Sequence, residues 1–270
     1  MDNLEEKVVV VTGGGSGIGR ASALAFAAAG SRVVVADVNA TRATEVAAEI
    51  EAGGSAAVGT ACDVTSLDDL VALRTLTLDR FGPVDVIMNN VGVVSMGEPL
   101  DIPMADWQRL VDVNLLSIVR SNEVFLPDLL EQGRGHVVNT ASIASLYPYT
   151  YDLLPYSATK AAVVGLSEAL AFYLRPRGIG ITCLCPGPVL TNIVEQITAH
   201  TDLSKMRVPS LSLLDATTVG DMVVRAVRED RFLLLTHPDE VHDILVRRAA
   251  DPEGWLTGAI EQFEAETPGG

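Results

Sequence analysis

The chain alternates short valine- and isoleucine-rich runs with helix-length segments almost from end to end, and no other feature constrains its fold as strongly. Val8–Val11 and Val33–Val35 are continuously apolar. Such runs are typical of parallel strands that are buried on both faces of a sheet. We therefore predict strands at Lys7–Thr12, Ser31–Asp37, Ser55–Cys62, Val84–Asn89, Gly135–Thr140, Gly180–Cys185 and Arg231–Thr236.

The intervening segments have the length and composition of helices. We predict helices at Ile18–Ala29, Arg42–Ala52, Leu67–Phe81, Ala105–Leu130, Tyr156–Leu174 and Thr217–Arg228. Strands joined by right-handed helical crossovers form a doubly wound sheet, which binds ligands at the carboxyl ends of its strands. The sequence thus predicts an α/β fold, a doubly wound (Rossmann-type) seven-stranded parallel sheet with helices on both faces.

Length and composition favour a single domain over residues 1–270. Of the 270 residues 48% are hydrophobic, which is enough for a sizeable core. We find neither an internal repeat nor a linker. The irregular, partly apolar stretch at about 188–215 is interpreted as a substrate lid. Two amphipathic pieces, Asp239–Ala249 and Gly254–Glu264, predict a helical C-terminal extension at about 238–266.

Charge and cysteine content exclude several classes of partner. The formal net charge of −16 disfavours nucleic acid and anionic membranes, which bind clustered Lys and Arg. No apolar run reaches the ~18 residues of a membrane span, and the acidic N-terminus does not resemble a signal peptide. The three cysteines are too few for a disulfide framework, and Cys183 and Cys185 are predicted to point to opposite faces of a strand. We expect a cytoplasmic protein.

A glycine-rich turn follows the first predicted strand. In Thr12–Arg20 the glycines are spaced Gly13-x-x-x-Gly17-x-Gly19, which permits a tight strand-to-helix turn and the close approach of a pyrophosphate to a helix N-terminus. Asp37 closes the second strand, where a carboxylate can accept both ribose hydroxyls of an adenosine and would repel a 2′-phosphate. The pattern predicts a dinucleotide, NAD in preference to NADP, although Arg42 lies near enough to accommodate a phosphate.

Tyr156 and Lys160 are four residues apart in a predicted helix, so their side chains share one face. A free tyrosine has a pKa of ~10 and is a poor acid–base catalyst at neutral pH. A neighbouring ammonium group favours the phenolate and lowers that pKa. The spacing therefore predicts a tyrosine activated by a lysine. The four histidines, in contrast, lack metal-ligand spacing, and we predict no metal site.

These motifs, taken in order, resemble those of the short-chain dehydrogenase/reductase family over roughly residues 5–235. The matching elements are Thr12-Gly13-x-x-x-Gly17-Ile18-Gly19, Asp63-Val64, Asn89-Asn90-Val91-Gly92, Asn114, Ser142, Tyr156-x-x-x-Lys160 and Pro186-Gly187. The resemblance implies an oxidoreductase that transfers a hydride between NAD(P) and a CH–OH group.

The resemblance also implies a role for each residue. Tyr156 would be the general acid/base, Lys160 would lower its pKa and bind the nicotinamide ribose, Ser142 would polarise the substrate carbonyl, and Asn114 would hold a proton-relay water. The implied cofactor-binding residues, with Tyr156 and Lys160 among them, are Gly13, Ser16, Gly17, Ile18, Gly19, Asp37, Asp63, Val64, Asn90, Gly92, Pro186, Gly187, Val189 and Thr191.

The chain departs from the family pattern in two places that bear on substrate and assembly. The spacing from Ser142 to Tyr156 is one residue longer than usual, and the loop Ser145–Leu154 is rich in tyrosine. The segment about 188–215 supplies apolar side chains, at Leu190, Ile193, Val194, Ile197, Met206, Val208, Leu211, Leu213 and Leu214. We predict a hydrophobic secondary alcohol or ketone as substrate. The family commonly buries the helix that starts at Tyr156, so a homodimer or homotetramer is expected.

Two other functions are open to the same sequence. Fold does not dictate activity, so a catalytically silent NAD-binding scaffold or sensor is one alternative. Loss of a catalytic residue would favour it, but Asn114, Ser142, Tyr156 and Lys160 are all present. An enoyl reductase or epimerase on the same fold is the other, which the longer Ser142–Tyr156 spacing leaves open.

Overall fold

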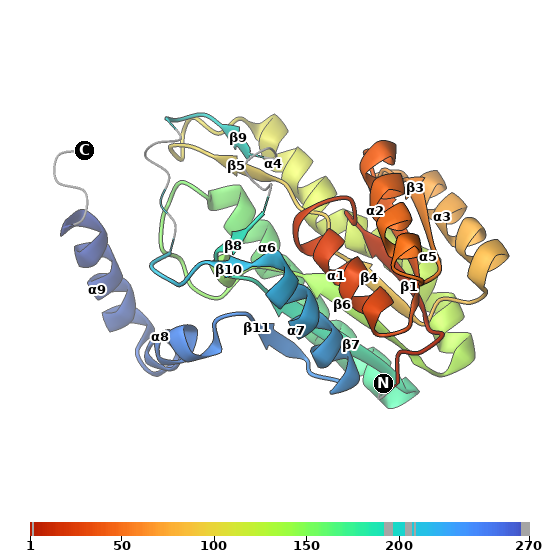
Figure 1. The fold of residues 1–270 in the computed structure, drawn as a ribbon. Coiled ribbons are helices and arrows are strands. Elements are labelled where there is room, and N and C mark those ends of the chain that lie inside the picture. Colours follow the sequence, from red (N-terminus) through yellow and green to blue (C-terminus); the bar gives the residue numbers. More distant parts are fainter. Residues whose placement is uncertain (2, 192–196, 203–206, 208, 266–270) are drawn as a thin grey trace.

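The computed structural model contains a parallel sheet covered by helices on both faces (Figure 1). It describes residues 1, 3–191, 197–202, 207 and 209–265. Within these residues the main sheet has seven strands in the order β11-β7-β6-β4-β1-β2-β3, and every pairing is parallel. The strands are β1 Val8–Thr12, β2 Arg32–Asp37, β3 Ala57–Ala61, β4 Val86–Asn89, β6 Gly135–Thr140, β7 Ile179–Cys185 and β11 Leu233–Leu235. The predicted fold class is confirmed.

Alternate valines of the strands point into two separate cores. Val9 and Val11 pack with helices α1, α2 and α7, whereas Val10 packs with α3, α5 and α6 on the other face. All three valines are completely buried. The helices are α1 Gly17–Ala28, α2 Ala40–Ala52, α3 Leu67–Phe81, α5 Ser117–Gln132, α6 Leu154–Leu174 and α7 Ala216–Arg228. A residue period of two therefore sorts the strand side chains between the helical layers.

Side-chain caps define where several helices begin. Asn39 accepts a hydrogen bond from the backbone N–H of Arg42 at the start of α2, and Ser66 does the same for Asp69 at the start of α3. Each cap satisfies one of the backbone donors that a helix N-terminus leaves unpaired. The caps thus fix the first residues of α2 and α3, directly after the segments that lead from the preceding strands.

The predicted helix Ala105–Leu130 is wrong as a single element. The chain instead forms α4 Met104–Val111, a π-helical turn at Asp112–Leu116, and α5 Ser117–Gln132. Asn114 lies in the π-helical turn, completely buried, and its side chain binds backbone atoms outside the helix. π-Helical turns interrupt the regular hydrogen-bond ladder and often occur at functional sites.

Among the described residues, four short strands lie outside the main sheet, and they were not predicted. Val94–Met96 (β5) pairs with Ile197–Ala199 (β9), and Val189–Leu190 (β8) pairs with Leu214–Asp215 (β10). Their pairs hold the region after β7 against the carboxyl end of the sheet. Figure 1 shows both pairs above or beside the same end of the main sheet.

Cys183 and Cys185 were predicted on opposite faces of β7, and this is wrong. Both pack in one hydrophobic cluster, whereas Leu184 between them packs in the core on the other face. Residues two apart in a strand share a face, because side chains alternate with every residue. All three cysteines are free thiols and buried.

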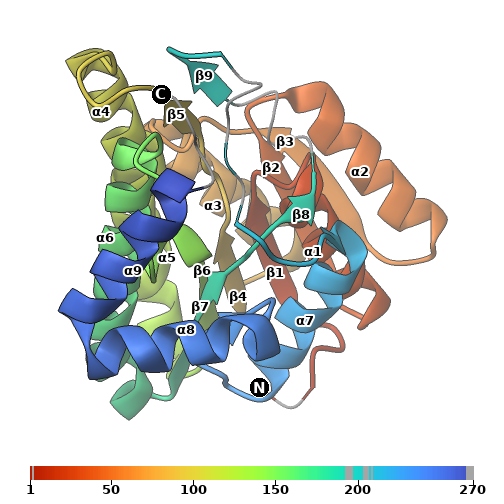
Figure 2. The ribbon, with the colours of Figure 1, turned by 90° about the vertical axis from the view of Figure 1, so that its left-hand side faces the viewer.

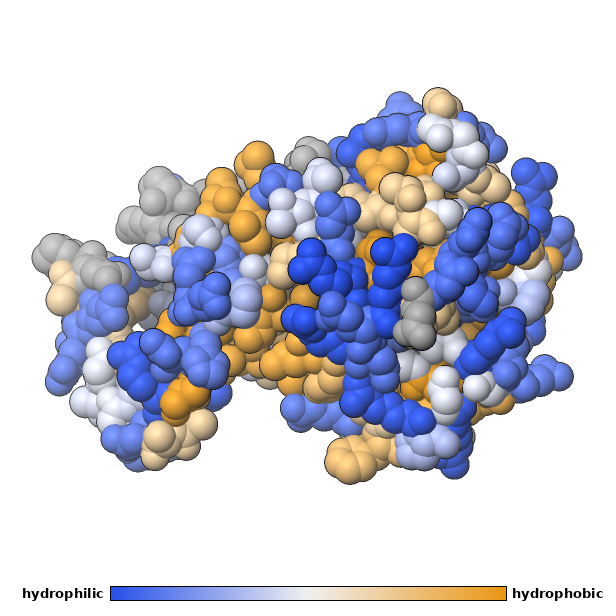
Figure 3. Space-filling view, turned by 60° about the horizontal axis from the view of Figure 1, so that its bottom comes forward, coloured by the Kyte–Doolittle hydropathy of each residue, from blue (hydrophilic) through white to orange (hydrophobic). Residues whose placement is uncertain are grey.

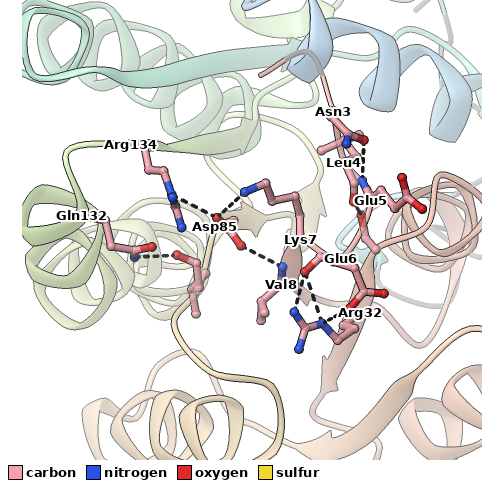
Figure 4. Close-up of polar contacts among 12 residues, drawn as sticks. Asn3, Leu4, Glu5, Glu6, Lys7, Val8, Arg32, Asp85, Gln132 and Arg134 are labelled. Atoms are coloured by element: carbon pink, nitrogen blue, oxygen red, sulfur yellow. Dashed lines mark hydrogen bonds and ion pairs between the residues drawn. The ribbon is translucent and has the colours of Figure 1, made fainter.

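At the amino ends of the strands, the buried carboxylate of Asp85 joins three elements (Figure 4). It accepts hydrogen bonds from the Lys7 ammonium group at 3.3 Å and from the backbone N–H of Val8 at 3.1 Å. Arg134 lies 3.7 Å away on the side of β6. This polar junction ties the amino ends of β1 and β4 together and leaves the opposite, carboxyl edge for ligands.

Two further helices follow the main sheet, α8 Pro238–Ala250 and α9 Pro252–Ala265. They correspond to the predicted helical extension. In Figure 1 they form an arm at the left of the molecule that follows β11, and Figure 2 shows this arm in front of the body. Its inner side packs through Val241 and Trp255 on Ile143 and Tyr147, which follow β6. No helix in the described part of the chain is both long and apolar enough to span a lipid bilayer.

A buried histidine in the sheet predicts acid sensitivity of the fold. His136 on β6 is 1% exposed, and burial lowers its pKa from 6.5 to about 3. Its Nε2 shares a 2.8 Å hydrogen bond with the Thr182 hydroxyl. Between these pH values the unfolded chain binds a proton that the folded chain excludes, so stability falls as pH decreases from about 6.5 toward about 3.

The wild type should lose unfolding free energy on the order of a few kcal/mol through His136 as the pH falls across this range. We expect His136→Gln not to show this loss. The measurement is urea denaturation of both proteins between pH 7 and pH 4, with comparison of the pH slopes. His242→Gln, at an exposed position of α8, is the matched control and keeps the wild-type slope. Equal slopes for wild type and His136→Gln would contradict the prediction.

Candidate active site and cofactor cleft

A cavity of about 630 Å³ lies at the carboxyl ends of β1, β2, β4, β6 and β7. This is the edge at which doubly wound sheets bind ligands. The glycine turn, Asp37, Asp63 and the Tyr156–Lys160 pair, which come from distant parts of the sequence, all line it. One cleft therefore contains both the predicted cofactor residues and the predicted catalytic residues.

The glycine turn is shaped by backbone that only glycine adopts easily. Gly13 and Gly17 have φ values of 63° and 52°, in the left-handed region. Gly19, the third residue of α1, faces the turn. A Cβ there would lie 2.1 Å from the Gly13 carbonyl oxygen and 2.6 Å from Asn90 Nδ2. The turn and the first helix thus meet in backbone-to-backbone contact beside the α1 N-terminus, as an anion-binding turn requires.

Asp37 lies beside this turn and holds its shape. One carboxylate oxygen accepts a hydrogen bond from the Gly15 N–H at 3.0 Å, and the other accepts from the Asn39 N–H at 2.9 Å. The side chain is partly exposed and lines the cavity. Asn39, not Asp37, caps the following helix. Asp37 thus presents negative charge to the cavity next to the glycine turn.

The wall of the cavity next to Asp37 is formed by the residues after β3 and β4. Asp63 accepts hydrogen bonds from the N–H and the hydroxyl of Thr65, at 2.9 and 2.7 Å. Asn90 donates to the Gly13 carbonyl at 3.3 Å and so fastens the glycine turn to the end of β4. Val64 is buried beside them. These contacts fix the cavity wall between the second and fourth strands.

Lys160 is the buried cation of the site. It projects from α6, is 2% exposed, and donates from Nζ to the Thr140 carbonyl at 2.8 Å. Nζ lies 5.9 Å from the centre of the Tyr156 ring, so the two side chains share a helix face as their spacing predicts. Burial lowers the pKa of Lys160 from 10.5 to about 8. The ammonium form therefore still predominates at neutral pH, although burial makes it less stable than in a free lysine.

Tyr156 lies in the first turns of α6 with its ring against the cavity. Burial raises the pKa of its phenol above 10, and a hydrogen bond with Ser142 acts in the opposite direction. The raised pKa is opposite to the lowering that the sequence predicts. Burial disfavours the phenolate, and the amine, which binds Thr140, contacts the ring without hydrogen-bonding the hydroxyl.

Ser142 directly follows β6 and caps a short 3₁₀ turn at Ile143–Ser145. Its side chain accepts the N–H of Ala144 at 3.2 Å, which leaves its own hydroxyl proton available for another acceptor. The Ser142 hydroxyl and the Tyr156 phenol both line the cavity, and Ser142 acts to lower the pKa of Tyr156. Two hydroxyl groups from separate elements thus point to one place, where a substrate oxygen can be bound by both.

Asn114 lies behind Lys160 and does not line the cavity. Its amide donates to the Val93 carbonyl at 3.0 Å and to the Thr159 hydroxyl at 3.2 Å, and its oxygen accepts from the Val93 N–H at 2.8 Å. Gly92 separates it from the amine, since a Cβ at Gly92 would lie 3.0 Å from Lys160 Nζ and 3.7 Å from Asn114 Oδ1. The π-helical turn therefore brings an amide oxygen close to the lysine.

Another wall of the cavity is formed by the residues after β7. The Gly187 N–H donates to the Thr236 hydroxyl at 2.9 Å, and a Cβ at Gly187 would lie 2.5 Å from the His237 ring. Thr191 lies against the glycine turn, 3.2 Å from where a Cβ of Gly17 would be. Pro186 and Val189 complete this wall. The segment after β7 thus closes over the turn after β1.

Every predicted site residue lines this cavity except Gly19 and Asn114, which support it from behind. The sequence did not single out Arg109, Thr140 or Arg207, which also line it. Thr140 contributes through its carbonyl, which carries no sequence signal. Arg109 reaches Thr198 of β9 at 2.9 Å, a contact that depends on the unpredicted β5–β9 pair.

The apolar residues expected in the lid are distributed over three places. Leu190, Ile197 and Leu213 line the cavity, Leu211 lines a neighbouring one, and Leu214 packs against the main core. The remaining four, Ile193, Val194, Met206 and Val208, lie outside the described residues. Tyr149 and Leu153 of the tyrosine-rich loop line the cavity as well. Within the described part of the chain no three His, Cys, Asp or Glu side chains group as metal ligands.

Comparison with known proteins places the chain in a family. The family model described as short chain dehydrogenase matches residues 7–202. The 7alpha-hydroxysteroid dehydrogenase of Escherichia coli K12 is 34% identical over 194 residues, which are 72% of this chain and 75% of that protein. The 3-oxoacyl-[acyl-carrier-protein] reductase of a Synechocystis species is 34% identical over 201 residues, 74% of this chain and 81% of that protein.

A solved structure matches nearly the whole length of this chain. The short chain dehydrogenase/reductase of Burkholderia phymatum, in complex with NAD, has a TM-score of 0.84 and 33% sequence identity. The match covers 94% of this chain and 96% of that one. With the parallel sheet, the glycine turn and the Ser142, Tyr156 and Lys160 cluster, these matches show that the chain belongs to the short-chain dehydrogenase/reductase family of oxidoreductases.

Proposed function

We propose that the protein is an NAD-dependent dehydrogenase that interconverts a hydrophobic secondary alcohol and its ketone. The observation that carries this proposal is that one cavity holds the glycine turn with Asp37 at one end and Ser142, Tyr156 and Lys160 at the other. Members of the family act on CH–OH and keto groups, and the family match gives the reaction class.

The residues present fit a dinucleotide. Gly13, Gly17 and Gly19 have no side chains to fill the space beside the α1 N-terminus. A Cβ at these positions would contact Val91, Thr191 and the turn itself, respectively. Such a turn suits a pyrophosphate. Asp37 would accept the adenosine ribose hydroxyls, Asp63 and Val64 would frame the adenine, and Lys160 would contact the second ribose. When bound, the nicotinamide would accept a hydride from the alcohol carbon or return one to the ketone.

Side chains of the protein would transfer the proton to and from the substrate oxygen. In the oxidation direction Tyr156 accepts the proton of the substrate hydroxyl, and in reduction it donates one to the substrate oxygen. The Ser142 hydroxyl donates to the same oxygen and stabilises its developing negative charge. Lys160 stabilises the phenolate of Tyr156 electrostatically. Asn114, next to Gly92 and the amine, would hold the relay that passes the proton on from Lys160 toward solvent.

The cavity walls support a hydrophobic substrate. Apolar side chains surround the reacting corner, among them Val94, Tyr149, Leu153 and Ile197. Apolar walls with a few polar groups are typical of sites for small organic ligands. The two relatives described above are named for a hydroxysteroid and a 3-oxoacyl substrate. We therefore expect the enzyme to favour apolar ketones over sugars and short hydroxy acids.

Asp37 predicts which nicotinamide cofactor is used. We expect the wild type to have the higher kcat/KM with NAD, because the carboxylate would repel the 2′-phosphate of NADP. Asp37→Ser should shift the ratio of the two kcat/KM values toward NADP by about tenfold, the effect of losing one charged hydrogen bond. Asp68→Ser, on an exposed position of α3, is the matched control. A wild-type preference for NADP would overturn the assignment of NAD.

The proposed activity is tested with a panel of secondary alcohols and ketones, with NADH formation or loss as the readout. Turnover of apolar members supports the proposal, and turnover restricted to sugars or small hydroxy acids refutes the substrate class. If NAD binds in calorimetry but no member of the panel reacts, the silent NAD-binding alternative is favoured over the enzyme.

We further propose that residues 1–270 act as one domain and assemble as a homodimer or homotetramer. Apolar side chains are exposed on two neighbouring helices, with Val119 of α5 and Phe172 and Tyr173 of α6 being 44%, 86% and 46% exposed. A second copy would cover them. Light scattering that gives the 28.5 kDa of one chain would refute this assembly. A cytoplasmic location stays a prediction from the sequence.

A further inference from the structure

A second cavity, of about 990 Å³, lies between the C-terminal arm and the body of the protein. One side is formed by α8 and α9, through residues such as Arg247, Trp255 and Phe263. The other side is formed by Tyr147–Tyr149 and by Pro209–Leu211. Figure 3 shows apolar surface between this arm and the body, on the side that lies at the bottom of Figure 1.

The second cavity adjoins the catalytic one. Tyr149, Arg207 and Pro209 line both cavities and so form the boundary between them. Tyr149 also packs with Tyr156, in the same hydrophobic cluster as Leu153. A molecule whose reacting carbon lies at Tyr156 would enter the second cavity by extending past these side chains.

The arm is fixed to the rim of the active site by specific contacts. The Phe263 ring lies 5.3 Å from the Tyr151 ring, and the Arg207 guanidinium lies 4.0 Å from the Phe263 ring. Near the junction of α8 and α9, Arg248 donates to the Leu146 carbonyl at 2.6 Å. These contacts join α8 and α9 to the loop that leads from Ser142 to Tyr156, so the cavity keeps its walls without a ligand.

The walls of the second cavity combine aromatic and cationic groups. Trp255 and Phe263 supply apolar surface from α9. Arg207 and Arg247 supply guanidinium groups from two different segments. Asp251 accepts the Gly254 N–H at 3.0 Å as part of the start of α9. Arg247 donates from Nε to the Asp243 carbonyl, and no ion pair of Arg247 occurs among the described residues.

We propose that the second cavity is a subsite for the distal part of the substrate and selects molecules that carry a carboxylate beyond an apolar body. The inference rests on the proposed function, because the reacting hydroxyl or keto group would bind at Ser142 and Tyr156. The apolar body passes Tyr149, and its end group reaches the arginines. A guanidinium group matches a carboxylate in shape and charge. Arg247 is thereby a specificity-determining residue of the reaction.

The test compares three substrates in wild type and variants. They are a medium-chain fatty acid hydroxylated at its penultimate carbon, its methyl ester, and a short secondary alkanol without a tail. We expect the wild type to favour the acid over the ester in kcat/KM by about fivefold, the upper end for a solvent-accessible ion pair. Arg247→Met should raise KM for the acid by the same factor and leave kcat, the ester and the alkanol unchanged.

Two further variants separate charge from packing. Phe263→Ala should raise KM for the acid and the ester alike, because it removes an apolar wall that both tails contact, and should spare the short alkanol. Arg228→Met, at an exposed position at the end of α7, is the control and should change none of the three. Arg247→Lys keeps the charge and should retain part of the preference for the acid.

Several results would overturn the subsite. The subsite is refuted if the wild type has equal kcat/KM for acid and ester, or if Arg247→Met affects all three substrates equally. In either case, turnover of the alkanol leaves the proposed function intact. Absence of turnover for every substrate refutes the proposed function instead. In that case the subsite is tested by calorimetric binding of the acid and the ester to the NAD-loaded protein. The subsite proposal predicts that the wild type binds the acid more tightly than the ester and that Arg247→Met binds both equally.

Discussion

Tyr156→Phe is expected to lower kcat by about 10³-fold or more while the affinity for NAD stays within a factor of about two. The substitution removes only the hydroxyl that exchanges a proton with the substrate oxygen. The ring keeps its place on α6, packed with Val94 and Leu153. Steady-state kinetics with an apolar secondary alcohol, beside calorimetric titration of NAD, measures both quantities.

The neighbouring hydroxyl provides the comparison for this variant. Ser142→Ala should lower kcat by about 10²–10³-fold, as expected for the loss of one donor to a developing oxyanion. It also removes the cap of the 3₁₀ turn at Ile143–Ser145. If Tyr156→Phe retains most of the wild-type kcat, another group transfers the proton and the assignment of Tyr156 is wrong.

Gly19→Ala should weaken NAD binding by at least about tenfold. The added Cβ would lie 2.1 Å from the Gly13 carbonyl oxygen and 2.6 Å from Asn90 Nδ2, distances that carbon atoms do not adopt in proteins. The turn and α1 would have to separate, and Gly13 and Asn90 both line the cofactor cleft. The effect on binding is therefore expected even though Gly19 does not itself line the cavity.

A matched glycine distinguishes this mechanism from a general effect of alanine. At Gly165, on an exposed position of α6, a Cβ would meet no atom within 4 Å. Gly165→Ala should leave NAD affinity unchanged and raise stability by up to ~1 kcal/mol, since alanine is the better helix former. Calorimetric titration and thermal unfolding of both variants make the comparison. Wild-type NAD affinity in Gly19→Ala would contradict the role given to the turn.

The sequence predicts the sheet and most of the cavity because both depend on local patterns. The bounds of β6 and α3 are as predicted. β6 is a fully buried segment with two central valines that begins at a glycine, and α3 has a serine cap and ends before Gly82. The glycine turn and the Tyr156–Lys160 pair are motifs of adjacent residues. Their convergence follows from the rule that parallel strands present their carboxyl ends at one edge.

The features that sequence did not predict depend on contacts between distant residues. The π-helical turn forms where Asn114 binds Val93, which lies on the connection after β4. The β5–β9 pair and the boundary residue Arg207 likewise depend on how the segment after β7 folds over the sheet. The sequence also did not predict that burial raises the pKa of Tyr156 in the protein alone, because spacing reports a neighbouring charge but not the burial that opposes it.

The central claim is that Lys160 and a bound NAD⁺ together make the Tyr156 phenol acidic enough to exchange protons near neutral pH. Ultraviolet difference titration of phenolate in wild type and Tyr156→Phe, with and without NAD⁺, tests it most directly. We expect one tyrosine to ionise below its ordinary pKa of ~10 when NAD⁺ is added to the wild type, and this signal to be absent in Tyr156→Phe. If NAD⁺ binds and no tyrosine ionises below that value, the claim is contradicted.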